Sequence, residues 1–219
     1  MKNRLIIALL LLLILSTYKI QNNFNFNSKV NIEKIIVENN FVVKEEIIKN
    51  KLSFLYGTSP LFLKSGRIES KLNEIEFIDS FKIKKIFPNK LKISIFEKKP
   101  IAILQNKKQK KYFTSKGDTI NYSYYKEFDN LPLVFGNKKS FSIFLKNLKI
   151  VNFPLNEVKI FYLFESKRWD VVTKNNQTIK LPIKNYNYSL KNFLEIKDKQ
   201  NFEKYKIFDY RINNQLILR

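Results

Sequence analysis

The chain has 219 residues, with 41 Lys or Arg against 19 Asp or Glu, and a formal net charge of +22. Its hydrophobic fraction of 44% and aromatic fraction of 15% exclude a disordered chain, because that much apolar surface drives collapse. The absence of Cys and His excludes disulfides, thiolate nucleophiles and the commonest general base. The length fits one large domain or two small ones.

The positive charge has two interpretations, a lysine-rich solvated surface or a functional basic face. Only five of the basic residues are Arg, and the abundant Lys, Asn, Ile and Phe are typical of an AT-rich coding bias. A protein that reads duplex DNA normally uses Arg for bidentate contacts with bases. We therefore expect no nucleic-acid partner, and any functional basic face is expected to attract a membrane surface.

The N-terminus predicts a membrane segment. Lys2 and Arg4 precede eleven consecutive apolar residues, Leu5–Leu15. The 14 residues Leu5–Tyr18 make about 21 Å of helix, against about 30 Å for the hydrocarbon core, so a cleaved signal peptide is the alternative. No small-residue cleavage site follows, which favours an uncleaved signal-anchor. We expect a cytoplasmic stub at 1–4, a transmembrane anchor at 5–20 (Leu5–Ile20), a polar spacer at 21–30 and export of the remainder.

Residues 31–100 predict a two-layer α+β domain. Apolar residues at helical spacing follow a short first strand, and Ser65 is the expected N-cap of a second helix that carries Ile68, Leu72 and Ile75 on one face. Alternating residues then predict a hairpin that turns at Pro88-Asn89 and is closed by Pro100. The expected elements are strand Ile32–Val37, helix Val43–Leu55, a helix from Ser65, strand Ile78–Ile86 and strand Leu91–Ile95.

Residues 101–219 predict a β-rich mixed domain with two helices. The helices are centred on Phe141–Leu148 and Leu190–Leu194, where apolar residues recur at helical spacing. A short segment, Leu131–Gly136, is expected to lead into the first of them. The expected strands are Ile101–Leu104, Lys111–Thr114, Val158–Phe164, Trp169–Thr173, Thr178–Leu181, Ile207–Arg211 and Leu216–Leu218.

Catalytic chemistry is not expected. The acidic residues are scattered, the four Gly fall at predicted turns, and neither a phosphate loop nor a nucleophile elbow occurs. Trp169 is expected to pack in the core, with a partner anchor as the alternative. Asp170 is expected to pair with a neighbouring Lys on the surface. We predict no enzyme activity, catalytic residue, cofactor, metal or small-molecule substrate.

Five motifs occur in an order that resembles the FtsQ/DivIB family of bacterial cell-division proteins, over nearly the whole chain. The Glu-Lys-Lys-Pro and Arg-Trp-Asp matches are the most specific. Three of the five Arg, namely Arg168, Arg211 and Arg219, fall on Arg positions of the family, which suggests that fork geometry is used. The matching segments are FIDSFKIKKIFPNKLKISIFEKKPIA (77–102), YFTSKGDTI (112–120), LPLVFG (131–136), SKRWDVVTKNNQTIKLP (166–182) and FDYRINNQLILR (208–219).

The resemblance implies a POTRA domain, then a β-rich FtsQ-type domain, in a single-pass scaffold of the bacterial inner membrane. The bulk of the chain is then expected in the periplasm at the division septum, with FtsB- and FtsL-like partners and also FtsK, FtsW and FtsI. An alternative class is a POTRA-containing accessory protein of outer-membrane assembly or export.

The resemblance also implies that the partner is captured at the last strand of the second domain. The local physics fits, because an open edge offers unpaired N–H and C=O groups to an incoming strand. The chain stops at Arg219, so no tail is expected to cover this edge. Arg168 and Arg211 are expected to pair with acidic groups of the partner, with ordinary ion pairs inside the chain as the alternative. The candidate partner-binding residues are Arg168, Arg211, Ile212, Asn214, Leu216 and Leu218.

Overall fold

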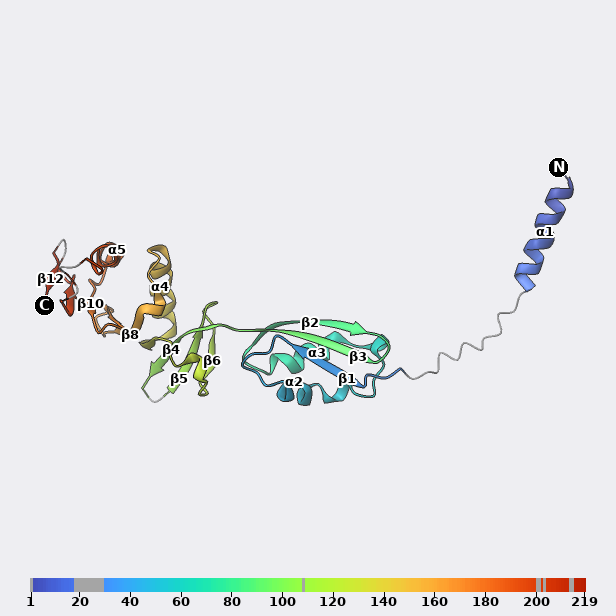
Figure 1. Cartoon of the computed structure of the whole chain (residues 1–219), viewed down its shortest axis with the longest axis horizontal. Helices are drawn as coiled ribbons and strands as arrows, with labels where there is room; N and C mark the ends of the chain where they lie inside the picture. The colour runs from blue at the N-terminus through green and yellow to red at the C-terminus, as the bar shows by residue number, and fades with distance from the viewer. Residues whose placement is uncertain (1, 18–29, 108, 200–201, 203, 213–214) are drawn as a thin grey trace.

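The computed structural model describes residues 2–17, 30–107, 109–199, 202, 204–212 and 215–219. Helix α1 (Lys2–Thr17) precedes two folded domains that lie end to end (Figure 1). Among the described residues, no helix combines the length and the apolar character needed to cross a membrane. The last residues of the expected anchor, 18–20, and nearly all of the expected spacer, 21–29, lie outside the described residues.

The first domain is a three-stranded sheet covered on one face by two helices, as predicted. Its strands are β1 (Lys34–Glu38), β2 (Ile78–Ile86) and β3 (Lys90–Glu97), in the order β1-β3-β2. β3 runs parallel to β1 and antiparallel to β2. The covering helices are α2 (Glu45–Lys51) and α3 (Ser65–Asn73), with 3₁₀ turns at Ser53–Leu55 and Pro60–Phe62.

The core of this domain is formed by residues that recur with the strand period of two and with the helical period. Alternate residues of β3, Leu91, Ile93 and Ile95, are buried, because successive strand residues point to opposite faces. They share a hydrophobic cluster with Ile48 of α2 and Ile68 of α3. The sheet and both helices therefore close over one apolar layer.

Two local predictions in this domain were wrong. Lys64 rather than Ser65 precedes α3, since Lys64 is still extended (φ −86°, ψ 112°) and Ser65 is already helical. Ile75 lies beyond the end of α3 at Asn73, although it still packs against the core. Pro100 follows the end of β3 and is the first residue of the next strand, a position where its missing N–H is tolerated.

The second domain contains a nine-stranded mixed sheet, with α4 (Lys138–Ile150) and α5 (Tyr186–Ile196) packed against its core. The strand order is β12-β11-β10-β9-β8-β7-β4-β5-β6, with parallel pairs at β4/β7, β7/β8 and β10/β11. The strands are β4 (Pro100–Asn106), β5 (Gln109–Thr114), β6 (Thr119–Asn121), β7 (Leu133–Phe135), β8 (Val158–Leu163), β9 (Trp169–Thr173), β10 (Thr178–Lys180), β11 (Ile207–Asp209) and β12 (Ile217–Leu218). The predicted α+β class, with two helices in the β-rich part, is confirmed.

The two hydrophobic cores do not separate at residue 100. Tyr112 and Phe113 are neighbours on β5, yet Phe113 belongs to the core under α4 and Tyr112 to the core of the first domain. Tyr112 contacts Phe128, with ring centroids 5.1 Å apart, and Phe77 lies 5.3 Å from Tyr125. A cluster of aromatic rings therefore joins the end of the first domain to the β4-β5-β6 corner of the large sheet.

The Glu of the Glu-Lys-Lys-Pro motif has a structural role. The Glu97 carboxylate accepts hydrogen bonds from three consecutive backbone N–H groups, those of Phe41, Val42 and Val43, at 2.9–3.1 Å. These donors lie in the bend just before α2, where backbone N–H groups belong to no helix or strand and need another acceptor. Glu97 thereby fixes the start of α2 against the end of β3.

Replacing this carboxylate is expected to destabilise the first domain. We expect Glu97→Ala to lower the free energy of unfolding by roughly 1.5–3 kcal/mol, because it removes charged hydrogen bonds and leaves several donors unpaired. Urea denaturation of the detergent-solubilised chain measures the change. Glu38→Ala is the matched control, since Glu38 forms only a surface ion pair with Lys92 and is expected to cost less than about 1 kcal/mol. Equal losses in both variants would contradict this role of Glu97.

Trp169 packs in the core, as predicted. Its ring stacks on Phe144 of α4, with centroids 4.6 Å apart and planes inclined by 12°. Gly136 lies against the same indole, and a Cβ added there would approach Trp169 Cη2 to 3.0 Å and Leu163 Cβ to 3.2 Å. The Gly of the LPLVFG motif is therefore required by close packing against the indole.

Adding a methyl group at this contact is expected to be destabilising. Gly136→Ala should lower the free energy of unfolding by about 1–3 kcal/mol, because the rigid indole must move. Gly66→Ala is the control: this residue lies within α3 with open space around its Cα, so it should be stabilising by roughly 0.5–1 kcal/mol. Thermal denaturation of both variants compares the two, and a stabilised Gly136→Ala chain would refute the packing argument.

Candidate functional site

The candidate site is the end of the large sheet that lies farthest from the first domain (Figure 1). β12 occupies this end and pairs with β11 alone among the described strands, through Phe208 opposite Leu218 and Asp209 opposite Ile217. The ladder continues at Arg219, which exchanges backbone hydrogen bonds of 2.9 and 3.1 Å with Ile207. β12 is therefore an edge strand with one partner among the described strands.

The register shows which backbone groups face outward. In antiparallel strands, hydrogen-bonded and non-hydrogen-bonded pairs alternate. Because Arg219 and Ile207 form a hydrogen-bonded pair, the N–H and C=O of Leu218 point away from β11. Leu216 lies just before β12, and the same alternation, continued by two residues, predicts that its N–H points outward. The free edge of β12 thus presents donors and acceptors in the spacing that an added strand requires.

A row of charges crosses the sheet beside this edge. Asp170 of β9 lies opposite Lys180 of β10, which lies opposite Asp209 of β11. Residues in register on neighbouring strands share one face, so Asp209 is also on the face of its partner Ile217 in β12. Both carboxylates are buried, with 5% of Asp170 and 4% of Asp209 exposed. Each is covered by an Arg two residues away on its own chain segment.

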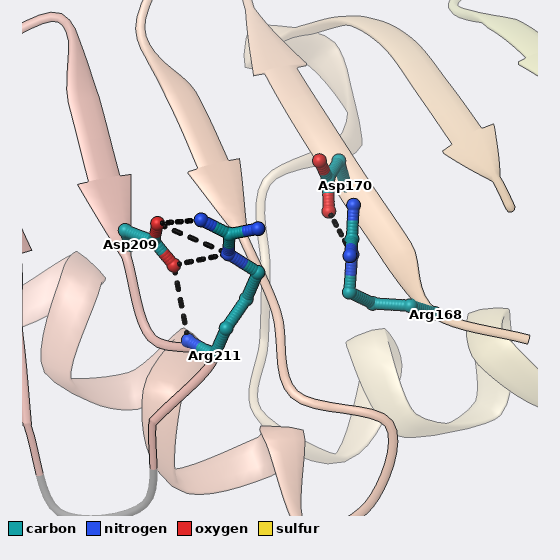
Figure 2. Close-up of polar contacts among 4 residues, drawn as sticks. All are labelled: Arg168, Asp170, Asp209 and Arg211. Atoms are coloured by element: carbon teal, nitrogen blue, oxygen red, sulfur yellow. Dashed lines mark hydrogen bonds and ion pairs between the residues drawn. The ribbon is translucent and has the colours of Figure 1, made fainter. Parts of the chain in front are cut away.

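The two Arg–Asp pairs differ in geometry, as Figure 2 shows. Arg211 binds Asp209 through two nitrogens, with Nη2 at 2.6 Å from Oδ2 and Nε at 2.8 Å from Oδ1. The Arg211 backbone N–H also donates to Oδ1, at 3.1 Å. Arg168 donates only through Nε, at 3.1 Å from Asp170 Oδ1, while its guanidinium lies over the Phe164 ring. The fork geometry is therefore used by Arg211 and not by Arg168.

The pKa values of the two carboxyls are shifted in opposite directions. Hydrogen bonds from Arg211 lower the pKa of Asp209 below its ordinary value, despite burial. Burial raises the pKa of Asp170 above its ordinary value, although the hydrogen bond from Arg168 acts in the opposite direction. Lys180, between them in register, favours the charged form of both.

A hollow of about 570 Å³ lies next to the edge, between α5 and the segment that leads into β12. Tyr188, Ile212 and Leu216 are among its lining residues, and 53% of Ile212 is exposed. The Tyr210 hydroxyl donates to Asn192 Oδ1 at 2.9 Å and closes one side. The hollow is large enough to receive a side chain from a molecule that approaches β12.

The structure brings most of the predicted partner-binding residues to one end of the sheet. Arg211 follows β11, Arg168 precedes β9, Ile212 and Leu216 line the hollow, and Leu218 lies in β12. Asn214 lies outside the described residues. The expected surface pairing of Asp170 with a Lys was wrong, because Asp170 is buried and its hydrogen-bonding partner is Arg168. Both Arg make the ion pairs inside the chain that were the alternative expectation.

Sequence reasoning missed Tyr188 and Lys180 at this site. Tyr188 lies on α5 away from the buried Leu190 and Phe193, where helical spacing alone predicts a solvent-facing residue of no special role. Lys180 lies between Asp170 and Asp209 because of the register of β9, β10 and β11, which the sequence alone does not reveal. The signal for Asp209 was present, since it belongs to the FDYR segment of the last motif.

Comparison with family models gives two matches that together cover most of the chain. The POTRA domain of FtsQ type matches residues 30–98, and the C-terminal domain of cell division protein FtsQ/DivIB matches residues 102–211. The second match alone covers half of the chain and includes Arg168, Asp170, Asp209 and Arg211.

Similar full-length proteins carry the same description. The cell division protein FtsQ of Rickettsia conorii is 28% identical over 209 residues, which cover 92% of this chain and 77% of that protein. The FtsQ protein of Rickettsia prowazekii is 28% identical over 210 residues, covering 92% and 78%. The FtsQ protein of Bartonella bacilliformis is 28% identical over 115 residues, covering 52% and 37%.

The opposite pKa directions of the two carboxyls predict opposite effects of removing their charge. Asp209 stabilises the fold above its unfolded pKa of about 3.9, and this contribution is lost as the pH falls through the lower folded value. Asp209→Asn is thus expected to lower the free energy of unfolding by about 1–3 kcal/mol at neutral pH. Asp170 has a raised folded pKa, so its charge opposes folding at neutral pH, and Asp170→Asn should leave stability unchanged or raise it.

Urea titrations at neutral pH and at about pH 3, followed by the fluorescence of Trp169, measure both effects. Both differences from the unmodified chain should shrink at the acidic pH, where the unfolded carboxyls are largely protonated. Equal destabilisation by both substitutions at neutral pH would show that the two pairs are electrostatically equivalent, against the geometry.

Proposed function

The chain belongs to the FtsQ/DivIB family of cell division proteins, and from this we propose that it is a single-pass membrane scaffold of the bacterial division machinery. Its two domains would lie in the periplasm at the septum and recruit FtsB- and FtsL-type partners, with FtsK, FtsW and FtsI as further candidates. The observation that carries the proposal is an FtsQ/DivIB-type domain that ends in an edge strand with one side open.

The proposed attachment to the inner membrane is through α1. Its central residues Leu5–Leu13 are apolar all round, and the large hydrophobic side chains among them are each more than half exposed. A helix that is hydrophobic on every face needs an apolar environment, which a lipid bilayer supplies. Lys2 and Arg4 at its start fit the cytoplasmic side of a bacterial membrane.

The proposed mode of recruitment is strand addition to the free edge of β12. A few backbone hydrogen bonds at a net 0.5–1.5 kcal/mol each supply only about 2–6 kcal/mol. The hollow beside Ile212 and Leu216 can add side-chain burial to this. Confinement of both partners to one membrane raises their effective concentration and supplies the remainder.

Arg168 and Arg211 are proposed to meet acidic groups of the partner while they hold their own aspartates. The ion pairs fix both guanidinium groups, so little side-chain entropy is lost when a partner carboxylate approaches. Arg211 is the stronger candidate, because it lies two residues after β11 and its side chain is substantially exposed. Arg168, which has the less exposed side chain, is proposed as the secondary contact.

The alternative class, an accessory protein of outer-membrane assembly or export, is not favoured. A POTRA domain alone would fit either class, but the model that matches residues 102–211 is of the division type. The proposed role is that of a scaffold, and we assign it no catalytic step, cofactor or small-molecule substrate.

One backbone N–H distinguishes strand addition from other modes of binding. We expect Leu216→Pro to weaken capture of an FtsB-like partner roughly tenfold or more, because proline deletes an outward donor and its ring obstructs pairing. Leu216→Ala is the matched control, since it removes the same side-chain contacts and keeps the N–H. Co-purification from solubilised membranes at a series of partner concentrations measures both variants. Equal capture by the proline and alanine variants would refute strand addition at this edge.

A further inference from the structure

Three segments meet at the end of the first domain that lies opposite the second domain (Figure 1). The Ile32 backbone N–H donates to Thr58 O at 2.9 Å, and the Gly57 N–H donates to Ile32 O at 3.1 Å. On the other side, the Glu33 N–H donates to Asn89 O at 2.9 Å. The tip is defined here as residues 32–34, 57–64 and 84–90. It is also the end at which the described part of the chain enters this domain, at residue 30.

Large apolar side chains are exposed on the tip. The exposed fractions are 84% for Phe62, 60% for Phe87 and 60% for Leu61. Phe62 and Leu61 lie in the 3₁₀ turn Pro60–Phe62, and Phe87 lies in the turn between β2 and β3. The two turns flank the start of β1, so the apolar groups lie on both sides of the entering chain. Three large exposed apolar side chains at one end of the domain are thus available to contact a partner or a membrane surface.

The lysines of the tip are not balanced by acidic residues. The tip carries five exposed lysines and one acidic residue, Glu33, whose carboxylate accepts a hydrogen bond from the Asn89 side chain. None of these lysines forms an ion pair within the described part of the chain. In register, Lys34 lies opposite Lys90, so like charges are adjacent. The five lysines are Lys34, Lys64, Lys84, Lys85 and Lys90.

The helical face of the same domain is different. There, lysines are paired with glutamates, as in Lys49–Glu45 at 2.8 Å and Lys71–Glu74 at 2.6 Å. A coding bias toward lysine acts on the whole chain and does not by itself sort glutamates away from one end. Coding bias alone therefore does not explain why the lysines of the tip lack acidic partners.

Exposed aromatic rings among lysines fit the surface of an anionic bilayer. The rings can enter the headgroup region, while the ammonium groups face lipid phosphates.

The linker between α1 and the first domain also favours a membrane as the occupant. Twelve residues separate Thr17, the end of α1, from Val30, and even a fully extended chain would span at most about 45 Å. The tip is thus held within about 45 Å of the end of α1, so it can reach the surface that α1 occupies.

We propose that the tip docks on the anionic phospholipid surface of the membrane in which α1 is anchored. Leu61, Phe62 and Phe87 enter the headgroup region, and the tip lysines bind lipid phosphates. The inference rests on the membrane anchor of the proposed function, and it adds a second contact between the chain and the same bilayer. An acidic protein surface is the competing occupant and is excluded or favoured by the following test.

The absence of Cys permits a single fluorescent label at any chosen position. The full chain carrying Phe62→Cys with an environment-sensitive dye is reconstituted in nanodiscs of phosphatidylcholine, with or without phosphatidylglycerol. A nitroxide-labelled lipid in the disc serves as the quencher. A chain labelled instead at Ile150→Cys, exposed at the end of α4, reports on the β-rich domain.

Docking predicts quenching of the label at position 62, and not at position 150, in anionic discs at ~0.1 M salt. The quenching should disappear at ~1 M salt, where the screening length falls from about 10 Å to about 3 Å. Lys84→Gln, Lys85→Gln and Lys90→Gln together should lower the ratio of docked to undocked tip at least about tenfold, because each lysine near an anionic surface contributes roughly fivefold. The matched control, Lys138→Gln, Lys139→Gln and Lys146→Gln, should leave it unchanged.

Electrostatic docking would be overturned if the label at position 62 were quenched equally in neutral and anionic discs. It would also be overturned if the two triple variants lost docking to the same extent. An incorporated chain whose label at position 62 is not quenched by lipid would contradict docking alone and favour a protein occupant. A chain that does not co-purify with the discs would contradict the membrane anchor as well, so the two failures are distinguishable.

Discussion

The arrangement of the molecule depends on one strand, β5, whose successive residues are buried in different cores. Phe113 faces α4, with its ring 5.0 Å from that of Phe141, while Tyr112 faces the aromatic residues at the end of the first domain. This follows from the period of two of a β-strand, which places neighbours on opposite faces. Because both faces are apolar, the corner of the large sheet is stable only when the first domain covers one of them. Ion pairing between Asp79 and Lys116, and hydrogen bonds from Asn121 to Glu76, reinforce the same contact.

At the other end of the sheet, polar groups determine the local structure. Asp170 and Asp209 are buried on strands that lie inside the large sheet, and each pairs with an Arg. The Arg that serves each one comes from the same segment, two residues away, so the pairs form locally and do not depend on long-range contacts. Arg211 gains a two-nitrogen fork and Arg168 a single bond with an aromatic ring beneath it. The edge strand β12 thus pairs with a strand whose buried carboxylate, Asp209, is already held by Arg211.

Much of the fold could be predicted from the sequence because periodicity is a local property. The alternation in 78–97 predicted a hairpin, and β2 and β3 occupy those positions. Ser65 was misplaced as a cap because the start of a helix is set by backbone angles that the residue type only biases. The pairing of Asp170 could not be predicted because it depends on burial, which the nine-strand order determines. Tyr188 and the hollow beside it depend on how α5 lies against residues 210–212 and 215–216, which no local sequence pattern predicts.

The tip and the edge strand β12 lie at opposite ends of the two folded domains (Figure 1). The aromatic rings around Tyr112 and Phe77 pack where the two domains meet, and this packing ties the two domains together. If the tip docks on the bilayer and a partner pairs with β12, as proposed, the two domains would act as a spacer between these contacts. The packing at Tyr112 and Phe77 would then set the distance from the membrane at which the partner is bound.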